Sequence, residues 1–242
     1  MKRILLFVVL LTSLVSSCGD NEVTRDPEAL GHHYFPLELG RYSIFNVTET
    51  KYTNNVKQIT SYQTRELINE VSTDQTGKDW YRVEVSRRNN ANDVWTITGV
   101  KMISKTFTDV EVKNNNRTTV EMVFPVVETK EWNPNAFNTD YDKEEEEHNR
   151  VKFFYQDVAR PFEIGGKSYA NTVKVIKSVG DPSVFNYLDV YEVYSKEQGP
   201  VYRFSHDRYY CDAGPGTNCQ VGSNYIISGL DRIETLTETG KI

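Results

Sequence analysis

A series of short segments in which apolar and polar residues alternate constrains the fold of this chain most strongly. The clearest segment is 80–88, where Tyr81, Val83 and Val85 occupy every second position and polar residues lie between them. This period of two places the apolar side chains on one face of a β-strand. Such segments follow one another with short polar connections and without a sustained helical period, so we expect an antiparallel meander.

The aromatic composition also favours strands. The chain has 15 Tyr and 11 Phe, many of them in segments rich in Val, Thr and Ile. We predict an all-β fold of about eleven or twelve strands, an antiparallel sheet that curves into a barrel or half-barrel. The expected strands are residues 42–52, 59–71, 80–88, 94–103, 106–113, 118–124, 151–157, 173–179, 187–195, 201–206 and 225–236, with a hairpin tip at Gly165-Gly166. Residues 125–150 break this rhythm between two halves of the sheet.

The N-terminus has the features of a cleaved export signal. Two basic residues, Lys2 and Arg3, precede an apolar run at 4–11 that is shorter than the roughly 20 residues needed to cross a bilayer. The small residues directly before Cys18 resemble the lipobox of bacterial lipoproteins. That resemblance implies cleavage before Cys18 and acyl chains such as palmitate on its sulfur. An ordinary signal peptide with an incidental thiol is the alternative.

These features divide the chain into a signal peptide at 1–17, a lipidated flexible tether at 18–33 and a single β domain at 34–242. Loss of the signal leaves 26 basic and 34 acidic residues, a net charge of about −8. A chain this acidic has no electrostatic reason to bind nucleic acid or anionic lipid. We therefore expect membrane contact only through the lipid on Cys18.

The two remaining cysteines bracket a loop rich in turn residues. Cys211 and Cys219 are separated by seven residues in an exported chain, so a disulfide between them is predicted. A metal site is the alternative, but only His206 lies near in sequence, and a site would need further ligands at suitable spacing.

Two longer motifs carry a resemblance to a family. They are Phe35-Pro36-Leu37-x-x-Gly40-Arg41-Tyr42 and Trp132-Asn133-x-Asn135-Ala136-Phe137-Asn138. Together with the lipobox, they resemble a group of uncharacterised outer-membrane lipoproteins of the Bacteroidota. The resemblance implies export, an outer-membrane lipid anchor and a β-rich domain, and it supplies no activity. The polar and acidic residues 19–22 are similar to a surface-export signal of such lipoproteins, and also suit a plain tether.

The sequence contains no motif for a familiar catalytic site. It lacks a Gly-x-Ser-x-Gly elbow, a His-Glu-x-x-His pair, a phosphate-binding glycine loop and a dinucleotide fingerprint. We predict no catalytic residue, no metal and no cofactor. The acidic run 144–147 with His148 is interpreted as a solvated loop, because four successive glutamates cannot converge on one ion. Paired carboxylates for glycoside cleavage are a spatial arrangement that the sequence leaves open.

The most ligand-like segment is the loop from 132 to 138. Its two aromatic residues, Trp132 and Phe137, suit stacking on a sugar ring. Its three amides suit hydrogen bonding to the hydroxyl groups of the sugar; they are Asn133, Asn135 and Asn138. The alternative, which the pattern favours, is that the aromatics plug the end of a barrel while the asparagines hold turns.

We therefore expect a non-catalytic, lipid-anchored surface or periplasmic protein that binds a ligand or serves the envelope, with a glycan or an envelope protein as partner. The alternatives are a glycan hydrolase with paired carboxylates and a carrier of an apolar ligand. The interior of the sheet discriminates among them. Two carboxylates that face each other would favour the hydrolase, and an apolar cavity would favour the carrier. A filled core would favour the binding role.

Overall fold

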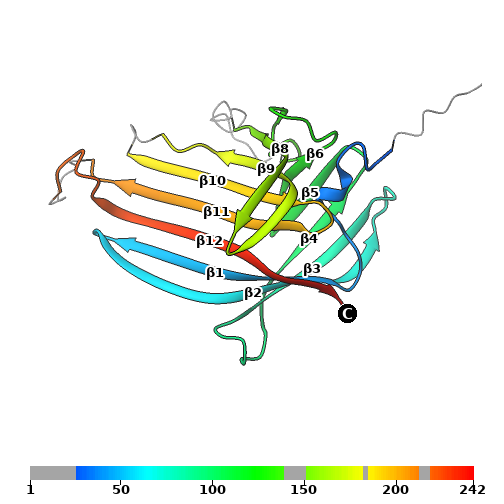
Figure 1. Ribbon diagram of the computed structural model, residues 1–242, viewed down its shortest axis with the longest axis horizontal. Helices are drawn as coiled ribbons and strands as arrows, with labels where there is room; N and C mark the ends of the chain where they lie inside the picture. Colours follow the sequence, from blue (N-terminus) through cyan, green and yellow to red (C-terminus); the bar gives the residue numbers. More distant parts are fainter. Residues whose placement is uncertain (1–25, 139–150, 182–184, 213–218) are drawn as a thin grey trace, which may run out of the picture.

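The computed structural model describes residues 26–138, 151–181, 185–212 and 219–242. These residues form one twelve-stranded antiparallel sheet and a single turn of 3-10 helix, and the sheet curves into a nearly closed barrel (Figure 1). The elements are η1 (His32–Tyr34), β1 (Arg41–Thr53), β2 (Val56–Thr73), β3 (Asp79–Arg88), β4 (Thr96–Lys105), β5 (Asp109–Asn114), β6 (Arg117–Val123), β7 (Glu131–Trp132), β8 (Phe153–Ile164), β9 (Lys167–Ser178), β10 (Asn186–Ser195), β11 (Gly199–Tyr210) and β12 (Ile226–Lys241). The predicted fold class is confirmed.

The order of the strands makes the sheet a meander of two halves. It runs β6-β5-β4-β3-β2-β1-β12-β11-β10-β9-β8-β7. Strands that follow one another in sequence are therefore neighbours in the sheet, except for β6 and β7, which form its two edges. In addition, the first strand, β1, is the neighbour of the last strand, β12. The first and last strands pair over their whole length, from Arg41 opposite Lys241 to Thr53 opposite Ser228. Residues 124–130 therefore connect the two edges of the sheet, and the two halves join at the chain's first and last strands.

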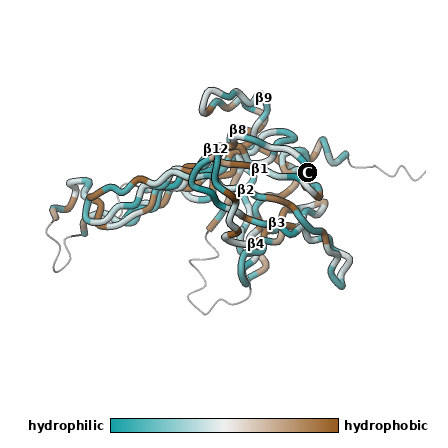
Figure 2. Tube along the Cα trace, turned by 90° about the horizontal axis from the view of Figure 1, so that it is seen from below, coloured by the Kyte–Doolittle hydropathy of each residue, from teal (hydrophilic) through white to brown (hydrophobic). Residues whose placement is uncertain are grey.

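The strands reach beyond the barrel at one end. The far parts of β10, β11, β12, β1 and β2 continue as a thin sheet, while the thick body holds the other strands (Figures 1 and 2). Cys211 and Cys219 lie in this extension with Cα atoms 5.9 Å apart, a spacing that permits the predicted disulfide. No helix of the described residues is long and apolar enough to cross a membrane.

The hairpin of β8 and β9 bends out of the barrel and crosses the outer face of the sheet (Figure 1). Asp157 and Ala159 adopt positive φ at the bend, where the register between the two strands shifts. The predicted tip, Gly165-Gly166, lies in the turn between the strands. Behind it, Lys167 Nζ donates to the Thr237 carbonyl at 2.6 Å, which ties the tip to β12.

The edge strand β6 is completed by the loop that follows it. Val120 N–H donates to the Pro134 carbonyl at 2.8 Å, and the Trp132 indole N–H donates to the Val120 carbonyl at 2.8 Å. Further along, the Asn138 amide donates to the Thr118 carbonyl at 2.7 Å and accepts from its N–H at 2.9 Å. Two side chains and a loop carbonyl thus replace the hydrogen bonds that a neighbouring strand would supply to β6.

A tyrosine from the other half of the sheet joins the same edge. The hydroxyl of Tyr155, in β8, donates to the Val123 carbonyl at 2.8 Å and accepts from the Val123 N–H at 2.9 Å. Its ring is fully buried and lies 4.7 Å from the Trp132 ring, which in turn meets Phe153 edge-on. The two edges therefore meet through side chains, and this contact is called the seam below.

Residues 26–33, which the sequence analysis assigned to the tether, pack against one end of the barrel. Val126 N–H donates to the Leu30 carbonyl at 2.9 Å, and the His32 ring stacks on Phe124 at 3.9 Å. Gly31 has φ of 89°, and a Cβ there would lie 2.7 Å from a Val126 methyl, so this close approach requires glycine. The buried rings of Tyr34 and Phe35 follow and join the core.

The seam yields a first prediction. Tyr155→Phe removes the hydroxyl that serves both backbone groups of Val123 and leaves them buried without partners. We expect it to lower the free energy of unfolding by about 1 to 3 kcal/mol in urea denaturation. Tyr81→Phe is the matched control, because the Tyr81 hydroxyl has no hydrogen-bond partner among the described residues. Equal losses in the two variants would contradict this role of Tyr155.

Candidate functional site

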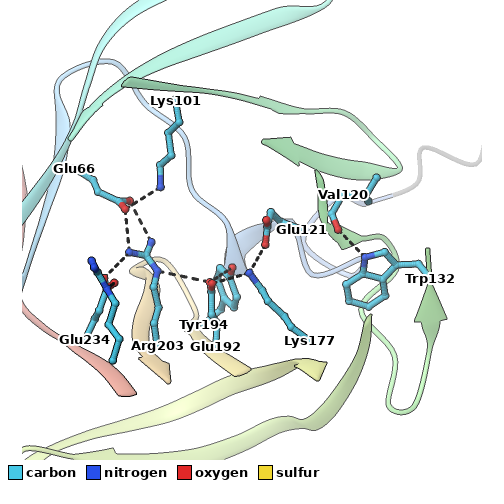
Figure 3. Close-up of polar contacts among 11 residues, drawn as sticks. Glu66, Lys101, Val120, Glu121, Trp132, Lys177, Glu192, Tyr194, Arg203 and Glu234 are labelled. Carbon is cyan, nitrogen blue, oxygen red and sulfur yellow. Dashed lines mark hydrogen bonds and ion pairs between the residues drawn. The ribbon is translucent and has the colours of Figure 1, made fainter. Parts of the chain in front are cut away.

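A network of charged side chains lies inside the barrel, centred on Arg203 of β11 (Figure 3). Its guanidinium donates to both carboxylate oxygens of Glu66, at 2.9 and 3.2 Å, and to Glu234 at 3.0 Å. Lys101 donates to the same Glu66 at 2.8 Å. Arg203 lies in β11 and Glu66 in β2, so this pair crosses the interior from one half of the sheet to the other. The Lys101 and Glu234 contacts each lie within one half.

A second cluster surrounds Lys177 of β9. Its ammonium contacts Glu121 of β6 at 2.5 Å and Glu192 of β10 at 2.6 Å. The other oxygen of Glu192 accepts a hydrogen bond from Tyr194 at 2.6 Å and lies 3.7 Å from the Arg203 guanidinium. Glu192 therefore links the two clusters into one network, and Lys177 joins β9 to the edge strand β6.

The network keeps two of its carboxylates, Glu66 and Glu192, ionised. Burial raises the pKa of Glu66, but Arg203 and Lys101 outweigh it, and the pKa lies well below its ordinary value. Burial acts in the same way on Glu192, where Lys177 and Arg203 outweigh it and lower the pKa to about 2. Burial lowers the pKa of Lys177, but the charges of Glu121 and Glu192 outweigh it and raise the pKa. Glu192 and Lys177 thus hold each other in the charged form.

The carboxylates of Glu121 and Glu192 face each other across one ammonium. Two neighbouring carboxylates are the arrangement that glycoside hydrolysis requires, but one of them must act as an acid whose pKa is raised. Lys177 occupies the space between these two, and the pKa of Glu192 is lowered. The pair therefore has the contacts of an ion cluster, and the lowered pKa of Glu192 is opposite to what a general acid requires.

A cavity of about 340 Å³ lies beside the network. Its wall combines charged and apolar side chains. The charged residues are Arg41, Glu66, Lys101, Glu121, Glu192 and Arg203, and the apolar ones include Phe35, Leu37, Ile68, Val83, Ile103 and Val112. Among the described residues, no group of three or more His, Cys, Asp or Glu side chains is placed to hold a metal ion.

The predicted ligand loop from 132 to 138 is largely occupied by its own contacts. Trp132 is only 8% exposed and packs in the core, so its ring faces are not open to a sugar; this is the plug arrangement. Asn135 N–H donates to Asn133 Oδ1 at 2.9 Å, and Asn138 binds β6. Phe137, at 53% exposure, is the one residue of the aromatic pair that reaches solvent. Ligand contact at this loop stays a prediction.

The remaining predicted sites lie away from the barrel interior or outside the described residues. Cys18 and the run 144–148 lie outside the described residues. His206 lies 3.8 Å from Asp231 on the sheet extension, and burial lowers its pKa although Asp231 opposes this. The interior network was not predicted from the sequence. One sequence feature could have indicated it. Glu66 lies between Thr64 and Ile68 at alternate positions that face the core, where a charged residue is unexpected.

Comparisons with known proteins reveal only distant likeness. The sequence matches no protein-family model and no curated protein. A structure described as "a putative exported protein with YmcC-like fold" from Bacteroides fragilis is similar, with 11% identity and a TM-score of 0.37. A "putative lipoprotein" from Parabacteroides distasonis has 13% identity and a TM-score of 0.32. Each alignment covers 86% of this chain and 98% of the other. At these scores the likeness carries no argument about function.

The lowered pKa of Glu192 predicts the dependence of stability on pH. A carboxylate whose pKa falls on folding stabilises the fold above its ordinary pKa of 4.5, and this stabilisation is lost as the pH falls toward about 2. Urea denaturation should therefore show a decline in the free energy of unfolding across this window. Glu192→Gln should reduce the slope and cost about 3 to 5 kcal/mol at pH 7, because Lys177 loses a buried partner.

The control for this experiment is Glu163→Gln, which removes an exposed carboxylate from the outer hairpin and should leave the slope as in the wild type. A wild-type slope in Glu192→Gln would mean that this carboxylate is not held ionised by the network.

Proposed function

We propose that this protein is a non-catalytic lipoprotein, anchored in the outer membrane through Cys18, that binds a ligand or assists the envelope at the surface or in the periplasm. The anchor rests on the basic start, the short apolar run and the small residues before Cys18. A glycan or an envelope protein remains the proposed partner. Nucleic acid is not proposed, because the mature chain is strongly acidic.

One observation supports the non-catalytic role most directly. In the barrel, Glu66, Glu121 and Glu192 each contact an arginine or a lysine. A general acid for glycoside cleavage keeps its proton near neutral pH because its pKa is raised. The pKa of Glu66 and that of Glu192 are lowered instead. Such carboxylates suit a fixed scaffold better than proton transfer.

The carrier of an apolar ligand is also less well supported. Apolar ligands bind in cavities whose walls are mainly hydrophobic. Part of this cavity's lining is apolar, but six charged residues line it as well. An entirely apolar molecule would cover these charged groups without replacing the hydrogen bonds that they make with water. We therefore do not propose that the protein carries an apolar ligand.

The proposal predicts two results with the full-length protein expressed in a bacterial host. The wild-type chain should carry acyl chains by intact mass and remain in the membrane fraction after carbonate washing, whereas Cys18→Ser should be soluble. The purified wild-type protein should release no product from a panel of chromogenic glycosides, because Lys177 lies between Glu121 and Glu192 and the pKa of Glu192 is lowered.

Membrane retention of Cys18→Ser after the wash would refute the anchor. Product release that disappears in both Glu121→Gln and Glu192→Gln, with the fold retained by circular dichroism, would refute the non-catalytic role. Glu163→Gln serves as the control for the loss of a carboxylate outside the barrel.

A further inference from the structure

The cavity in the barrel contains one cation that differs from the others. Arg41, at the start of β1, donates from Nη2 to the carbonyls of Glu197 and Gln198, at 2.7 and 3.1 Å. It forms no ion pair with any described residue. Burial lowers its pKa, and only the charge of Glu38 opposes this. A partly desolvated guanidinium with neutral partners gains more from a carboxylate than one that already has a partner.

Several neutral polar side chains around the same cavity also have free hydrogen-bonding groups. The hydroxyls of Ser43 and Thr119 and the amide of Gln198 line it, and they form no side-chain hydrogen bond within the described part of the chain. Lys101 uses one of its three N–H groups on Glu66. The cavity therefore offers donors and acceptors suited to a ligand that carries hydroxyl groups.

Part of the cavity lining is apolar. Ile68, Val83, Ile103 and Val112, from four neighbouring strands, form a floor against which the C–H face of a sugar ring can pack. The volume of about 340 Å³ is at the lower end of the range for small-molecule sites, so a ligand of monosaccharide size fits better than a polymer.

We propose that this cavity binds a small hydroxylated carboxylate, such as a sugar acid, with its carboxylate on Arg41 and its ring on the apolar floor. This inference rests on the proposed function, because it names the ligand of a binding protein. Both N–H groups of Arg41 Nη2 are donated to carbonyls, which leaves Nη1 and Nε for a ligand. A carboxylate accepts from them a charge-assisted hydrogen bond that is stronger than the bond a hydroxyl group accepts. Arg41 thus determines the preference for an anion.

The test measures binding of four probes to the full mature domain by isothermal titration calorimetry. The probes are glucuronate, its neutral counterpart glucose, the cation glucosamine, and octanoate as an apolar anion. We expect binding of glucuronate and weaker or no binding of the other three. Arg41→Gln should weaken glucuronate binding roughly ten- to hundredfold, the range for one lost charged hydrogen-bonding group.

Two further variants separate ligand contact from damage to the fold. Thr119→Phe leaves Arg41 in place and fills the cavity, so it should abolish binding. Arg160→Gln removes an exposed arginine outside the cavity and should bind as the wild type does. Thermal melts of all variants report whether the 196–198 turn, which Arg41 holds, remains folded.

The outcomes distinguish this inference from the proposed function. No binding of glucuronate, equal binding of glucose, preference for octanoate, or unchanged binding in Arg41→Gln or Thr119→Phe would overturn the inference and leave the non-catalytic role intact. Cleavage of a glucuronide by the wild-type protein would overturn the proposed function, whatever the affinities.

Discussion

Charged side chains that lie largely buried in the barrel must find partners, and in this fold two of the ion pairs join opposite halves of the sheet. Arg203 of β11 binds Glu66 of β2, and Lys177 of β9 binds Glu121 of β6. An unpaired charge in this position would cost several kcal/mol. The curvature that brings these strands face to face is therefore coupled to the network, and the seam at Tyr155 depends on the same curvature.

The strands were predictable because their signals are local. Alternation and turn residues located every long strand and the Gly165-Gly166 tip. The pairing of β1 with β12 depends on residues almost the whole chain apart, so no local pattern reports it. The two-residue strand β7 and the packing of 26–33 were missed for a related reason, since both form only against a surface that other strands create.

The candidate site was less predictable than the fold. The aromatic loop at 132–138 attracted attention as a ligand surface, yet Trp132 fills the core and completes an edge strand. The network was invisible as a motif, because its members lie on seven strands and meet only in the folded sheet. Since the cations of the network all pair with its carboxylates, the groups left for a ligand are few, and Arg41 is the cation lining the cavity that forms no ion pair with a described residue. A rigid scaffold with a small polar cavity is consistent with binding.

The central claim is that ion pairs across the interior stabilise the closed barrel. A double-mutant cycle of Glu121→Gln and Lys177→Met tests it most directly, because Lys177 is the ion-pair partner of Glu121 across the interior. Urea denaturation at pH 7 of the wild type, both single variants and the double variant gives the coupling energy. The account predicts a coupling of about 1 to 3 kcal/mol. A coupling near zero would contradict it, since the ion pair between β9 and the edge strand β6 would then contribute nothing to closing the barrel.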